Sequence, residues 1–180
     1  MSSEPNTDIR PALAAGLSSY LIWGVAPLFF QALDFANPFE IVMHRIIWAV
    51  PILALVLAVS GKMRQALAVL ADRRTILTLV GTAALISVNW WIFIFAVNSG
   101  HVLQASLGYY INPLMSVAVG VIVLREPLGP FRIAAIVLAA LGVANQIIAV
   151  GQVPWISLAL ATSFTAYGYL RKVAAVDGRI

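Results

Sequence analysis

The 180-residue chain is 62% hydrophobic and only 10% charged, with a formal net charge of +4 and a mean hydropathy of +0.96. Because soluble domains carry about 25% charged residues, this composition excludes most classes of soluble protein. The sequence contains no cysteine, which excludes disulfide, thiolate and covalent haem-attachment chemistry.

Six apolar stretches, each close to the length of a membrane-spanning helix, follow one another along the chain. A helix of roughly 20 residues crosses about 30 Å of hydrocarbon. Backbone polar groups in lipid must be satisfied within their own segment, so these stretches predict an all-α, polytopic membrane protein that contacts the lipid bilayer. The predicted spans are Pro11–Gln31, Phe39–Ser60, Thr75–Val97, Val102–Leu124, Phe131–Ala149 and Val153–Leu170.

The basic residues predict the orientation of these spans. The connections around Asp34, Asn98–Gly100 and Gly151 contain no Lys or Arg. Ten of the eleven basic residues lie on the other side of the predicted helices, and Arg45 lies inside the second span. We therefore expect a multi-pass inner-membrane protein with both termini in the cytoplasm. The ten residues are Arg10, Lys62, Arg64, Arg73, Arg74, Arg125, Arg132, Arg171, Lys172 and Arg179.

The second span carries three ionisable residues near its outer end: Glu40, His44 and Arg45. An arginine near the bilayer centre costs about 2.5–3.5 kcal/mol on insertion scales, so it either extends to the interface or faces protein, water or a ligand. Glu40 and His44 share one helix face and could form a proton relay or a local structural pair. Only one further histidine, His101, is present, so no metal site is expected.

The third and fourth spans carry more polar residues, again toward the outer side. In the fourth span, Gln104, Gly108, Asn112, Ser116 and Gly120 recur every four residues, a pattern that allows close helix packing. Pro113 removes a backbone donor after Asn112, which produces either a simple kink or irregular backbone lining a cavity. A polar cleft open to the outside would explain this distribution. The predicted substrate-binding residues are Arg45, His44, Asn89, Trp90, Gln104, Tyr109 and Asn112.

The sixth span resembles the first at an offset of 144 residues, although membrane helices of similar composition also match by chance. A repeating unit of five helices would place its second copy in the opposite orientation, as in many secondary transporters. We expect residues 1–10 to form a cytoplasmic tail, 11–149 one five-helix repeat, and 150–180 the truncated start of a second. The identical pairs are Ala15 with Ala159, Ser19 with Ser163, and Gly24 with Gly168.

Several functional motifs are absent from the sequence. It contains no Gly-rich phosphate loop, no H-E-x-x-H and no G-x-S-x-G. We therefore expect neither an enzyme nor a bound cofactor. Nucleic acid is not an expected partner either, because no basic stripe interleaved with aromatic residues occurs.

Three segments carry a resemblance to a known family: EIVMHRIIWA, NWWIFIFAVNSGHVLQASLGYYINPL and LREPL. They resemble the EamA family of the drug/metabolite transporter superfamily, over essentially all of residues 10–176. The resemblance implies ten helices in two inverted repeats around a central pocket, and a secondary carrier that exports a small metabolite or drug. This sequence ends after the sixth span. The alternative is therefore a non-transporting fragment or assembly subunit that self-associates or pairs with the missing second repeat.

Overall fold

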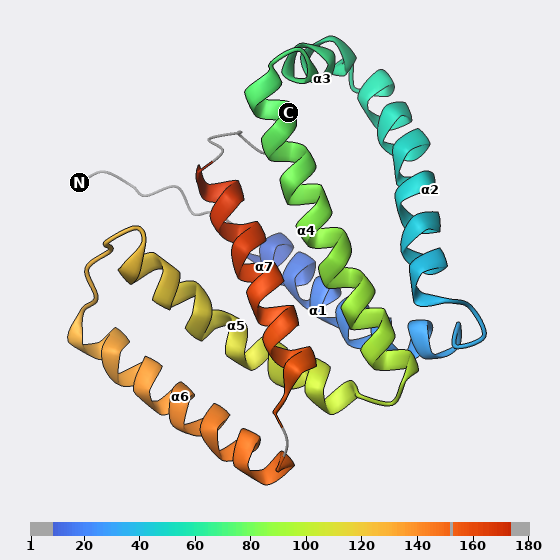
Figure 1. Cartoon of the computed structure of the whole chain (residues 1–180). Helices are drawn as coiled ribbons and strands as arrows, with labels where there is room; N and C mark the ends of the chain where they lie inside the picture. Colours follow the sequence, from blue (N-terminus) through green and yellow to red (C-terminus); the bar gives the residue numbers. More distant parts are fainter. Residues whose placement is uncertain (1–8, 152, 174–180) are drawn as a thin grey trace.

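The computed structural model describes residues 9–151 and 153–173, and within these ranges all regular secondary structure is helical, as predicted (Figure 1). Five helices are long and apolar enough to cross a membrane, so the chain is a polytopic membrane protein. The helices are α1 (Arg10–Gln31), α2 (Pro38–Val59), α3 (Met63–Leu70), α4 (Arg73–Asn98), α5 (Val102–Ile122), α6 (Pro130–Val150) and α7 (Trp155–Val173).

The sixth predicted span forms α7, but α7 is not among the five helices with membrane-spanning hydropathy. Its sequence carries several hydroxyl side chains, and its last turn contains Arg171 and Lys172. Three of those hydroxyl residues, Ser157, Ser163 and Thr165, are buried. Helix α7 can therefore be more polar than the other helices, because part of its polar surface is buried against protein.

The short helix α3 lies where the sequence analysis expected only a connection between two spans. Its apolar residues Met63, Ala66, Leu67 and Leu70 recur at the spacing of one helix face. Eight residues are too few to stand out as a membrane span, which is why hydropathy alone did not reveal this helix. In Figure 1, α3 joins the ends of α2 and α4.

Local side-chain chemistry determines where the helices begin and end. The Asn37 side chain caps α2 by accepting a hydrogen bond from the Phe39 N–H at 2.9 Å, and Pro38 occupies the first turn. Between α4 and α5, Gly100 adopts a positive φ of 76°, which permits the His101 N–H to donate to the Ala96 carbonyl at 2.7 Å. These caps fix the register of the helices that carry the polar residues.

Helix α4 is the central element of the arrangement. Helices α1 and α2 each pack against α4, while their own backbones stay apart. Helix α7 packs against both α4 and α5, and α6 covers α5 (Figure 1). The main core lies where α1, α2, α4, α5 and α7 meet. Its buried residues include Phe30, Ile41, Phe93, Ile94 and Ile156. The separation of the α1 and α2 backbones leaves an opening beside α4.

Small residues allow α5 and α7 to approach closely. A Cβ atom added at Gly108 would lie 3.1 Å from both the Leu160 Cβ and the Ser157 carbonyl oxygen. The Ser157 hydroxyl donates to the Gln104 carbonyl oxygen at 2.6 Å. The four-residue stripe of the fourth predicted span therefore includes the surface on which α7 packs.

Candidate functional site

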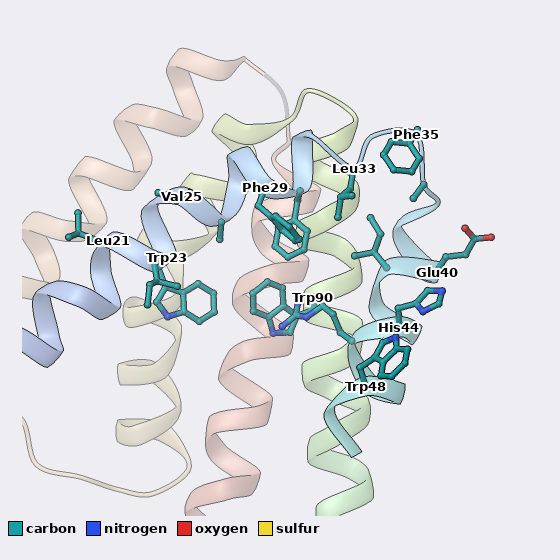
Figure 2. A pocket seen from close by; sticks show the side chains of 16 residues that line it. Leu21, Trp23, Val25, Phe29, Leu33, Phe35, Glu40, His44, Trp48 and Trp90 are labelled. Atoms are coloured by element: carbon teal, nitrogen blue, oxygen red, sulfur yellow. The ribbon is translucent and has the colours of Figure 1, made fainter. Parts of the chain in front are cut away.

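A pocket of about 1080 Å³ occupies the opening between α1 and α2, beside α4 (Figure 2). Thirteen of its sixteen lining residues are apolar or aromatic, and the other three are Glu40, His44 and Arg45. A large apolar pocket with a few polar groups is the usual form of a small-molecule site. The pocket lies where the backbones of α1 and α2 both approach α4 but not each other, so that side chains alone bridge the two helices.

Arg45 places its guanidinium over an aromatic ring within this pocket. The Arg45 Cζ lies 3.7 Å from the centroid of the Trp90 ring and 5.8 Å from that of Phe30. Arg45 is seven residues into α2, about 11 Å along the helix, and Trp90 is eight residues before the end of α4, about 12 Å from it. The two residues therefore lie at similar distances from the neighbouring ends of their helices, where the Arg45 guanidinium lies over the Trp90 ring.

Aromatic residues of α1 and α4 hold Trp90 in place. Trp23 stacks on Trp90 with ring centroids 5.3 Å apart and an interplanar angle of 23°, and Figure 2 shows the two indoles facing each other. Phe30 and Phe93 contact Trp90 at 5.9 and 5.6 Å. Offset and edge-to-face contacts of this kind contribute about 0.5–1.5 kcal/mol beyond area burial. The ring under Arg45 is consequently part of a packed cluster.

Glu40 and His44 lie on α2 at the pocket's edge. Figure 2 shows both side chains on the same side of α2, with the Glu40 carboxylate pointing away from Trp90. Both residues are exposed. No cluster of metal-ligating residues occurs within residues 9–151 and 153–173.

Two of the other predicted site residues, Asn89 and Asn112, form hydrogen bonds with α7. The Asn89 side-chain amide donates to the Leu160 carbonyl and the Ser163 hydroxyl, both at 2.9 Å. The Asn112 side-chain oxygen accepts from the Thr165 hydroxyl at 3.0 Å. These bonds join α7 to α4 and α5.

Tyr109 and Gln104 complete the predicted set. Tyr109 is half exposed, contacts Phe93 at 6.0 Å between ring centroids, and lines a separate crevice of about 10 Å³ with Asn89 and Asn112. A cavity of about 10–15 Å³ is the least that holds one water, so this crevice is too small for a substrate. The Gln104 side-chain oxygen is buried without a hydrogen-bond partner among the described residues. The structure thus groups Arg45, His44 and Trp90, and separates them from the other four residues.

Sequence reasoning missed the contribution of α1 to the pocket. Trp23, Ala26 and Phe30 line it, and their spacing of three and four residues places them on one helix face. That spacing was visible in the sequence. It did not distinguish a pocket wall from a lipid-facing stripe, because both are apolar.

Comparison with known proteins identifies the family. The model of the EamA-like transporter family matches residues 10–145, which is most of the chain. The chain belongs to the EamA-like transporter family. The resemblance seen in the three sequence segments is therefore confirmed, and Arg45, Trp90 and the pocket all lie inside the matched region.

Similar proteins occur in several bacteria. The chain is 41% identical over 172 residues to an uncharacterized transporter of Vibrio cholerae, covering 96% of this chain and 57% of the relative. It is 39% identical over 170 residues to Protein RarD of Salmonella typhi, with 94% and 58% covered. It is 38% identical to the uncharacterized transporter YojE of Bacillus subtilis, with 90% and 55% covered. The chain thus spans somewhat over half the length of these relatives. No solved structure matches it.

Proposed function

We propose that this protein is a secondary transporter of the inner membrane that exports a small metabolite or drug, and that the substrate binds between α1 and α2. Arg45, His44 and Trp90 contact the substrate in this proposal, and Trp23 and Phe30 hold Trp90. Asn89, Gln104, Tyr109 and Asn112 position α7. The observation that carries the proposal is a membrane-embedded arginine stacked on tryptophan in a pocket of about 1080 Å³.

We further propose that α7 is a sixth membrane-spanning helix and that both termini are cytoplasmic. The connections around Lys62 and Arg132 carry positive charge, whereas those on the opposite side carry none, and basic loops remain in the cytoplasm. Residues 11–149 form one repeat in this proposal, and α7 begins a second one in the opposite orientation. Support comes from the match of Ser163 with Ser19 and from the family's transporter character.

A thiol placed in the pocket tests the proposed site. Mass spectrometry of growth medium first identifies compounds that cells release only when they express the protein. Ala26→Cys then introduces one thiol into the pocket of this cysteine-free chain, and the matched control Gln65→Cys places one on α3. Labelling with N-ethylmaleimide is expected to stop release through Ala26→Cys and not through Gln65→Cys. Unchanged release by fully labelled Ala26→Cys would contradict the proposal.

A further inference from the structure

The positive charge of Arg45 lacks a carboxylate partner in the part of the chain that the structure describes. The ion pair formed there joins Lys172 to Glu126, far from the pocket at the other end of the helices. Glu40 lines the same pocket, but its carboxylate points away from Trp90, over which the Arg45 guanidinium lies (Figure 2). His44, the third ionisable group of the pocket, cannot supply negative charge.

The contacts that Arg45 does make leave most of its bonding capacity unused. A guanidinium carries five N–H donors in a planar fork, and none of them donates to an acceptor among the described residues. Stacking on Trp90 offsets only part of the cost of placing an arginine in a membrane span. A planar oxyanion would accept two parallel hydrogen bonds from the fork and neutralise its charge.

The remainder of the pocket limits what this anion can be. Its walls are apolar and aromatic, among them Trp23, Phe29 and Trp48. A pocket of about 1080 Å³ is much larger than an inorganic anion needs, so the ligand also has an apolar body. Arg45 is the only Lys or Arg among the lining residues. A single positive charge beside the acidic Glu40 favours a ligand with one negative charge over a polyanion.

The position of the Arg45 guanidinium favours a small ligand over a membrane lipid. Arg45 lies seven residues, about 11 Å, along α2 from its first residue, and its guanidinium lies over the Trp90 ring inside the pocket. A phospholipid that paired with Arg45 at this position would have to draw its headgroup out of the interfacial layer, whereas a small molecule enters the pocket whole.

We infer that the substrate is a small amphipathic monocarboxylate, whose carboxylate pairs with Arg45 and whose apolar body lies against Trp23 and Trp48. This inference rests on the proposed function, since it names the substrate class of the same pocket. It goes beyond that function by assigning the charge of the substrate and the residue that recognises it.

Three ligands of nearly equal shape and different charge provide the test. The purified full chain in neutral detergent is titrated with 4-phenylbutyrate, its neutral amide 4-phenylbutyramide, and the cation 4-phenylbutylamine. Tryptophan fluorescence reports occupancy, because Trp23, Trp48 and Trp90 line the pocket. We expect 4-phenylbutyrate to bind at least about ten times more tightly than 4-phenylbutyramide. This is the gain expected from a charge-assisted hydrogen bond. Arg45→Gln should remove this preference, and Arg45→Lys should retain part of it.

The control and the alternative outcomes make the inference falsifiable. Arg64→Gln, which removes a positive charge from α3, should bind all three ligands as the wild type does. Equal saturable binding of amide and carboxylate would overturn the substrate class while leaving the proposed pocket intact. An absence of saturable binding by all three would overturn both. Displacement of the carboxylate by added phosphatidylglycerol, at equal detergent, would show that Arg45 binds a lipid headgroup and would also overturn the inference.

Discussion

Replacing Gly108 by alanine should destabilise the packing of α5 against α7. The added Cβ would lie 3.1 Å from the Leu160 Cβ, 3.1 Å from the Ser157 carbonyl oxygen and 3.3 Å from the Ser157 Cα. None of these atoms is the flexible end of a side chain, so the backbone of α7 near Ser157 must shift by a few tenths of an ångström. That movement also stretches the hydrogen bond from the Ser157 hydroxyl to the Gln104 carbonyl, now 2.6 Å long.

The expected magnitude follows from two opposing effects. Overpacking in a well-packed interior costs about 1–3 kcal/mol, while glycine to alanine in a helix interior gains up to about 1 kcal/mol. Gly142→Ala is the matched control, because a Cβ at that position in α6 meets no atom within 4 Å. Gly108→Ala should therefore be less stable than Gly142→Ala by about 1–3 kcal/mol.

Reversible unfolding in mixed detergent micelles provides the assay. Circular dichroism follows helix content as the fraction of sodium dodecyl sulfate rises, and the shift in midpoint between the two variants gives the difference in unfolding free energy. The reasoning would be refuted if Gly108→Ala unfolded at the same midpoint as Gly142→Ala or later. That result would mean that α5 and α7 can move apart without a loss of stability, and that this contact does not require glycine.

Three further predictions concern the loops. Hydrogen bonds from Thr75 lower the pKa of the Asp72 carboxyl below its ordinary value. Asp72 therefore stabilises α4 above about pH 3.9, and this stabilisation is lost as the pH falls further. The Asp72→Ala variant should melt at a lower temperature than the wild type at pH 7 and at the same temperature at pH 2. Glu126→Gln removes a half-exposed ion pair with Lys172. It should lower the free energy of unfolding by about 0.2–1 kcal/mol at low salt and by less at high salt. A loss that does not depend on salt would contradict an electrostatic origin. In intact spheroplasts, an impermeant maleimide should label Ser99→Cys and spare Gln65→Cys, and the reverse pattern would overturn the proposed topology.

The sequence revealed the unusual residue of the pocket but not its surroundings. Arg45 stands out because a charge inside an apolar span is visible without a structure. Its partner Trp90 and the stacked Trp23 come from other helices, and nothing local in the sequence specifies which helices pack side by side. The fold class was also predictable, because the hydropathy of a segment depends on its composition and length alone.

Polar residues in the spans were harder to interpret. Asn89 and Asn112 are predicted substrate ligands from the sequence, and in the structure both form hydrogen bonds with α7. A buried polar group needs a partner in either case, and the sequence does not say whether that partner is a ligand or another helix. The stripe containing Gly108 and Asn112 did indicate close helix packing, and α7 is the helix that packs there.

The central claim is that the pocket holding Arg45 is the site through which a substrate leaves the cell. Release of the exported compound by cells expressing Arg45→Ala, compared with Arg64→Ala at equal membrane levels, tests this most directly. Both variants lose one positive charge, but only Arg45 lines the pocket. The account predicts that Arg64→Ala releases the compound at the wild-type rate and that Arg45→Ala loses most of the release. Equal release by the two variants would contradict it.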